Sequence, residues 1–232
     1  MKLAIMQPYF LPYIGYFQLM AAVDLFVVYD NIKYTKKGWI NRNRMLQNGK
    51  DAMFSLPLKS GSDSLNVCER ELAADFKRDK LLNQFNGAYR RAPYFAQAFP
   101  LIEQIVRHED TNLSRFLHHA ISLTCGYLGI TTEIRVSSDI TIDHELRNQG
   151  KVLALCGAVG ATTYVNAGGG RELYSKSAFQ ERGIDLKFIQ SKPFEYVQFG
   201  DAFVPWLSII DVIMFNSVGE ISENLASGYE LI

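Results

Sequence analysis

Residues 2–30 read KLAIMQPYFLPYIGYFQLMAAVDLFVVYD, and this stretch decides the fold. The apolar run at 2–6 predicts a buried strand that stops at Gln7-Pro8. Pro12 and the apolar pattern behind it predict a loop that leads into a helix. Residues 23–29 predict a second buried strand, which ends at Asp30. A strand, a helix and a strand in such close succession form a βαβ unit, so we expect a parallel sheet.

The same alternation of strands and helices resumes in the second half of the chain. Further strands are predicted at residues 52–58, 132–136, 162–166 and 185–189, and helices at 149–159 and 175–182, with two short helices in the tail. Residues 74–129 have a helical pattern throughout. We therefore predict one α/β domain over residues 1–232, with a Rossmann-like parallel sheet and a helical insertion at 74–129.

Composition excludes several classes of protein. The 24 basic and 24 acidic side chains balance, so the whole chain carries no electrostatic footprint for DNA. Cys68, Cys125 and Cys156 are far apart, which excludes a disulfide framework and suits a reducing cytosol. The histidines lack metal-ligand spacing, so no metal site is predicted. No apolar run approaches the roughly 20 residues that span a bilayer, and we expect a cytoplasmic protein.

Three segments follow strand ends, where open parallel sheets bind their ligands. The first runs from Gln7 to Tyr16 and leads into a helix N-terminus, whose free N–H groups favour an anion. Its candidate binding residues are Gln7, Tyr9, Tyr13, Gly15 and Tyr16. A rigid turn that only packs the first helix explains this segment equally well.

The second segment, residues 30–44, is the strongest electrostatic feature. Residues 31–50 contain six lysines and arginines and no acid. Guanidinium groups suit diphosphates because their planar fork donates two hydrogen bonds at once, and an indole offers a stacking face for a base or sugar. Asp30 is a candidate catalytic carboxylate, and the candidate binding residues are Lys36, Trp39, Asn41, Arg42 and Arg44.

The third segment, NAGGGRELY at residues 166–174, follows a predicted strand directly. Gly168, Gly169 and Gly170 would let backbone N–H groups turn toward a phosphate, although a flexible turn has the same composition. Asn166 and Glu172 stand beside them as candidate catalytic residues, and Tyr174 as a binding residue.

The C-terminal run LSIIDVIMF contains a single acid, Asp211. A buried aspartate needs a partner, and we expect one of the arginines. A dimer contact and a place in the core both suit Phe203, Pro205, Trp206 and Leu207, and we expect the core.

Four motifs in order, QPYFLPYIGYF, DLFVVYD with KKGWINRNR, YVNAGGGREL and FVPWLSIIDVIMFN, resemble the WbqC-like family of bacterial proteins. That resemblance implies a role in O-antigen or other surface-polysaccharide biosynthesis. It also implies transfer of an aminoacyl, glycyl or acyl group, with charged tRNA as a possible donor, onto a nucleotide-linked amino sugar.

A weaker likeness to HUP-like proteins concerns Tyr13-Ile14-Gly15-Tyr16, which occupies the place of the HxGH signature of nucleotidylyltransferases and class I aminoacyl-tRNA synthetases. Tyrosine cannot carry the positive charge of a histidine, which counts against adenylyl transfer.

Three functions follow from these features. The first is a transferase on a dTDP- or UDP-linked amino sugar, which needs no cofactor. Arg42, Arg44 and the glycines would hold the diphosphate, Asp30 or Glu172 would act as general base, and Gln7 and Asn166 would orient polar groups. The second is a nucleotidylyltransferase-like enzyme, which alone would use Mg²⁺. The third is a non-catalytic nucleotide-sugar-binding or scaffold protein.

Overall fold

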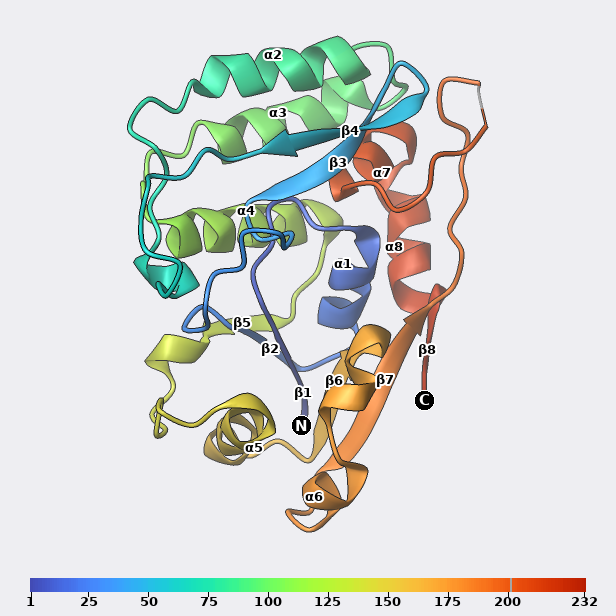
Figure 1. The fold of residues 1–232 in the computed structure, drawn as a ribbon. Helices are drawn as coiled ribbons and strands as arrows, with labels where there is room; N and C mark the ends of the chain where they lie inside the picture. The colour runs from blue at the N-terminus through green and yellow to red at the C-terminus, as the bar shows by residue number, and fades with distance from the viewer. Residues whose placement is uncertain (201) are drawn as a thin grey trace.

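The computed structural model describes residues 1–200 and 202–232 and is built around a six-stranded sheet of order β5-β2-β1-β6-β7-β8 (Figure 1). The strands, in chain order, are β1 (Lys2–Met6), β2 (Leu25–Val28), β5 (Glu133–Val136), β6 (Thr163–Ala167), β7 (Asp185–Ser191) and β8 (Tyr229–Leu231). All pairs are parallel except β7 with β8. The predicted Rossmann-like α/β class is confirmed.

The order of the strands places a switch point between β1 and β6. From β1 the chain moves to β2 and β5 on one side, and then returns to β6 and β7 on the other. The pairing of β1 with β6 is limited to Lys2↔Thr163 and Leu3↔Tyr164, whereas β6 pairs with β7 as far as Ala167. Because the ladder stops early, β1 and β6 separate toward their carboxyl ends.

Helices cover both faces of the sheet. The hydrophobic core on one face includes residues of α1 (Ile14–Ala21), α4 (Leu113–Leu128) and α8 (Val218–Ser227), and also of α7 (Ile209–Phe215), which contacts α3 (Phe95–Val106), α8 and β3 (Arg42–Gln47). The other face packs against α5 (Asn148–Ala158) and α6 (Lys176–Gln180). The alternation along β1 explains the division, because Ala4 belongs to the first core and Leu3 and Ile5 to the second.

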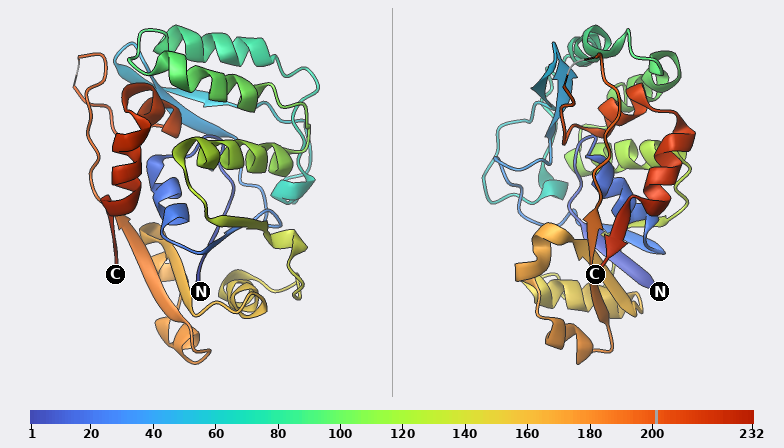
Figure 2. Two further views of the ribbon diagram at one scale, coloured as in Figure 1. Left: turned by 180° about the vertical axis from the view of Figure 1, so that it is seen from behind. Right: turned by 90° about the vertical axis from the view of Figure 1, so that its right-hand side faces the viewer.

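Much of the segment between β2 and β5 lies above the sheet in Figures 1 and 2, at the end toward which β1 and β7 run. It contains the antiparallel hairpin β3 (Arg42–Gln47) and β4 (Lys50–Ser55), the 3-10 turn η1 (Val67–Glu69), and the helices α2 (Arg78–Tyr89), α3 (Phe95–Val106) and α4. The three helices lie where the sequence predicts them. β3 is not predicted, because its arginines hide an alternation in which Asn43 and Met45 are buried.

Asp211 on α7 is fully buried, and the expected arginine partner is wrong. Its carboxylate accepts hydrogen bonds from the Tyr89 hydroxyl (2.9 Å), the Tyr196 hydroxyl (2.7 Å) and Gln198 Nε2 (2.8 Å). Burial raises the pKa of Asp211, and the three donors oppose that rise. The carboxylate thus ties α2 and the segment after β7 to α7.

Within the described ranges, no helix combines the length and the apolar character needed to cross a lipid bilayer.

Candidate functional site

A cavity of about 420 Å³ opens at the switch point of the sheet. Met6, the last residue of β1, and Ala167, the last residue of β6, line it where the two strands separate. We call it the switch-point cavity. Open α/β sheets bind their ligands at this position, outside the carboxyl ends of the strands.

The start of α1 forms one wall of the switch-point cavity. Tyr13 is the N-cap of this helix and caps no N–H with its side chain, and Tyr13, Gly15 and Tyr16 all line the cavity. The Tyr16 hydroxyl donates to the Gln7 carbonyl oxygen at 3.1 Å. Burial raises the pKa of Tyr16 well above its ordinary value, so this side chain stays neutral. With Tyr16 committed to Gln7, the position of the second HxGH histidine offers no charge to a triphosphate.

Two indoles and one cation also line the switch-point cavity. Trp39 from the loop before β3, Arg44 of β3 and Trp206 from the loop before α7 all line the cavity. The Arg44 Cζ atom lies 5.6 Å from the centroid of the Trp39 ring. The rings of Tyr13 and Trp206 are 5.3 Å apart. Trp39 and Trp206 are 42% and 61% exposed, so two large aromatic faces remain open to a ligand.

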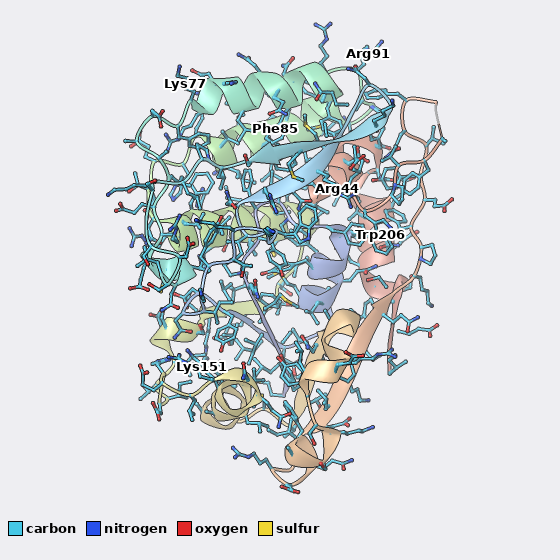
Figure 3. All side chains as sticks on the ribbon, viewed as in Figure 1. Arg44, Lys77, Phe85, Arg91, Lys151 and Trp206 are labelled. Carbon is cyan, nitrogen blue, oxygen red and sulfur yellow. The ribbon has the colours of Figure 1, made fainter. Side chains whose placement is uncertain are left out.

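Arg44 also connects the hairpin to the loop before α7, and Figure 3 shows its side chain close to Trp206. Its Nη2 donates to the Trp206 carbonyl oxygen at 3.1 Å, and its Nη1 to Asp51 at 3.3 Å. Its Nε is buried and has no acceptor among the described residues. The described lining of the cavity contains no Asp or Glu, so Arg44 is its one charged side chain.

Asn43, also on β3, fixes the loop between β1 and α1. It is buried, and its Nδ2 donates to the carbonyl oxygens of Leu11 (2.8 Å) and Phe10 (3.3 Å). Leu11 has a positive φ of 46°, which a non-glycine residue holds only when its surroundings fix it. The Ser208 hydroxyl donates to the same Leu11 oxygen at 2.6 Å. The loop that lines the cavity is therefore held from both sides.

The structure brings together part of the predicted site. The predicted residues that line the switch-point cavity are Tyr9, Tyr13, Gly15, Tyr16, Trp39 and Arg44. Those outside its lining are Gln7, Asp30, Lys36, Asn41, Arg42, Asn166, Gly168, Gly169, Gly170, Glu172 and Tyr174. The sequence reasoning missed Asn43, although it lies within the quoted NRNR motif, and Trp206, which was expected in the core.

Three residues of the basic segment make contacts of their own. Lys36 forms an exposed ion pair with Asp63 at 2.6 Å. The Asn41 amide bridges the Tyr34 hydroxyl and the Leu56 carbonyl oxygen, each at 2.8 Å. Arg42 Nε donates to the Gly38 carbonyl oxygen at 2.9 Å. Their polar groups are used to hold the loop before β3.

The glycine-rich segment forms a 3-10 helix, η3 (Gly168–Leu173), directly after β6. A Cβ at position 170 would collide with the Asn166 amide, and one at position 168 would come within 3.3 Å of the Ile189 carbonyl oxygen. A side chain at either position would force its neighbours to move, so close packing here favours glycine. Tyr174 packs against Tyr164 and Phe179, with ring centroids at 5.6 and 5.7 Å, on the side of the sheet that α5 and α6 cover.

Asp30 lies after β2 and joins it to β5. Its carboxylate accepts from the Ser137 hydroxyl (2.8 Å), the Ser138 hydroxyl (2.8 Å) and the Ser138 N–H (3.0 Å). Both serines belong to the 3-10 turn η2 (Ser137–Asp139), and Asp30 is only 3% exposed. This arrangement explains Asp30 as a structural cap of the strand ends.

We expect Asp30→Asn to lower the free energy of unfolding by about 1–2 kcal/mol, because an amide replaces one of the two accepting oxygens. Ligand affinity at the switch-point cavity should not change. Urea denaturation and calorimetric titration of the same preparation separate the two effects. A stable variant without turnover would instead restore the prediction that Asp30 is catalytic.

The comparisons with known proteins agree with this arrangement of motifs. Residues 7–223 match the model of the WbqC-like protein family. The chain belongs to that family. It is also 31% identical over 231 residues to the uncharacterized protein Rv1507c of Mycobacterium tuberculosis (strain ATCC 25618 / H37Rv), covering 97% of each chain. No solved structure matches the chain significantly. The residues matched by the family model include every lining residue of the switch-point cavity from Tyr9 to Trp206.

Proposed function

We propose that this WbqC-like protein is a cytoplasmic transferase of cell-surface polysaccharide biosynthesis that acts on a nucleotide-linked amino sugar in the switch-point cavity. The observation that carries the proposal is one guanidinium between aromatic walls at the switch point of a Rossmann-like sheet. The volume of about 420 Å³ falls in the range of small-molecule sites.

The walls of the cavity match the parts of a nucleotide sugar. The indoles of Trp39 and Trp206 can stack on a planar base or on the apolar face of a sugar ring. Arg44 and the uncapped start of α1 supply a cation and free N–H groups for the diphosphate. Because the cavity lining has no carboxylate among the described residues, it does not repel that anion.

The transfer step needs an activated acyl donor, for which we propose an aminoacyl ester such as charged tRNA. The neutral amine of the sugar attacks the ester carbonyl carbon, a C–N bond forms, and the C–O ester bond breaks. The proton leaves the amine and ends on the alcohol oxygen of the donor. Of the two predicted general bases, Glu172 on η3 is exposed and Asp30 is buried and hydrogen-bonded. Glu172 lies outside the cavity lining, on the segment that directly follows the lining residue Ala167, and we propose it as the base that takes the proton from the amine.

Thermal unfolding of the pure protein tests the binding step. A dTDP- or UDP-linked amino sugar at about 100 times its dissociation constant should raise the melting temperature by about 5 °C or more. Nucleoside diphosphates alone should give a smaller rise. A rise only with magnesium triphosphates would support nucleotidyl transfer instead, and no rise with any of these compounds would contradict the proposal. Amide formation, followed by mass spectrometry with an aminoacyl donor, then tests the transfer.

A further inference from the structure

A second cavity, of about 280 Å³, lies on the other side of Tyr13 and Trp206. These two residues line both cavities, and their rings are 5.3 Å apart. We call it the second cavity. Its volume is just below the range of about 300–1,000 Å³ that is usual for whole drug-sized ligands. It therefore suits a small group next to whatever the switch-point cavity holds.

Five aromatic side chains help to line the second cavity. Phe194, Tyr196 and Phe203 join Tyr13 and Trp206 around it. Tyr196 lies 5.4 Å from Phe194 and 5.1 Å from Phe203, measured between ring centroids. The hydrogen bond from the Tyr196 hydroxyl to the buried carboxylate of α7 fixes the central ring of this group. Fixed aromatic faces of this kind attract cations through the ring quadrupole.

Two charged side chains of opposite sign line the second cavity. Lys192 and Glu195 both line it. Lys192 is paired with Glu230 at 3.4 Å, whereas Glu195 takes part in none of the ion pairs between described residues. Glu195 is therefore the lining carboxylate that has no ion-pair partner among the described residues. A carboxylate and aromatic faces together recognise an ammonium group.

The boundary between the two cavities is built from unusual backbone. Trp206 has a φ of 61°, a strained value for a tryptophan, and Arg44 holds its carbonyl oxygen. Gly15 lines the switch-point cavity, and Ser191 lines the second one. A Cβ at position 15 would come within 3.0 Å of the Ser191 Oγ atom. The missing side chain thus keeps α1 and the end of β7 close without filling the space between the cavities.

We propose that the second cavity binds a small primary ammonium group and presents the molecule that carries it to the switch-point cavity across Tyr13 and Trp206. This inference deepens the proposed function. The role given to the ammonium group rests on that function, whereas its binding rests on the lining of the second cavity alone. The ammonium has two possible sources. It belongs either to an aminoacyl donor or to the amino sugar itself, and the experiment distinguishes them.

Of the two tryptophans of the chain, Trp39 lines only the switch-point cavity, whereas Trp206 lines both cavities. A probe that enters only the second cavity should therefore change the fluorescence emission of Trp206 and leave that of Trp39 unchanged. In Trp39→Phe, Trp206 is the only emitter, and in Trp206→Phe, Trp39 is the only one. Glycinamide represents the aminoacyl source and glucosamine the sugar source. N-acetylglycinamide and N-acetylglucosamine are their uncharged controls. A UDP-linked amino sugar reports on the switch-point cavity through Trp39.

We expect a saturable change in the emission of Trp206 with glycinamide or glucosamine, and none with the acetylated controls. Glu195→Gln should weaken the binding of the ammonium probe about fivefold. Glu181→Gln, an exposed glutamate beside α6, is the matched control and should not weaken it. A response to glycinamide alone supports the aminoacyl source, and a response to glucosamine alone supports the sugar source.

Equal binding of the acetylated controls, or an unchanged affinity in Glu195→Gln, would overturn the inference. So would the absence of any response from Trp206, or an effect on Trp39 emission alone. If the ammonium probes bind as expected but the UDP-linked sugar leaves Trp39 unchanged, the proposed function fails and the inference stands.

Discussion

Replacing Asp211 with alanine is expected to lower the free energy of unfolding by about 3 kcal/mol, because it leaves buried donors without an acceptor. Three donors from two parts of the chain converge on this carboxylate: Tyr89, Tyr196 and Gln198. The Tyr89 hydroxyl also accepts the backbone N–H of Leu46 in β3 at 2.9 Å. The loss therefore reaches the hairpin that carries Arg44.

Urea denaturation followed by circular dichroism measures this effect. Asp211→Asn is the matched control, since an amide oxygen still accepts hydrogen bonds and a neutral group avoids the cost of burying a charge. We expect Asp211→Asn to lose about 1 kcal/mol or less. If the alanine variant lost no more than the asparagine variant, the converging hydrogen bonds would not be what holds these segments together.

The parallel sheet was predictable because its strands are short apolar runs ended by turn residues. The pattern KLAIM followed by Gln7-Pro8 gives β1 at Lys2–Met6, the bounds that the structure shows. β3 carries two arginines on the face opposite the buried Asn43 and Met45. From the sequence alone, these arginines indicate a basic loop and not a strand. β8 has only three residues, which is too short to show the alternation of apolar and polar residues that predicts a strand.

The site was predictable where its residues follow strand ends, and not where distant segments meet. Tyr13 and Gly15 follow from their position after β1. Trp206 is 162 residues from Arg44 in the sequence, yet its carbonyl oxygen accepts a hydrogen bond from the Arg44 guanidinium. Trp206 also has a positive φ, which a sequence pattern does not predict for a tryptophan. The partners of Asp211 also come from other segments of the chain, and the sequence leads us to expect an arginine in their place. Its donors are two tyrosine hydroxyls and one amide. They satisfy the buried carboxylate without bringing a second charge into the core.

Replacing Arg44 with alanine is expected to weaken the binding of a nucleotide-linked amino sugar by about 10–100-fold, the value of one or two charge-assisted hydrogen bonds. Arg44 is the one charged side chain in the described lining of the switch-point cavity, so no neighbour can replace its cation. The variant also loses the bond to the Trp206 carbonyl oxygen, which frees the wall shared by the two cavities. Isothermal titration with the nucleotide sugar and with its nucleoside diphosphate measures the loss.

Arg42→Ala is the matched control for this change. Arg42 lies on the same strand two residues away, but its Nε donates to Gly38 and it does not line the cavity. We expect Arg42→Ala to keep the affinity within about twofold, because screening weakens a charge that makes no direct contact. Arg44→Lys should fall between wild type and Arg44→Ala, because it keeps the charge but not the planar fork. Equal losses in Arg42→Ala and Arg44→Ala would mean that the basic segment attracts the ligand only through its summed charge. In that case, the diphosphate would not be held by a guanidinium in the switch-point cavity.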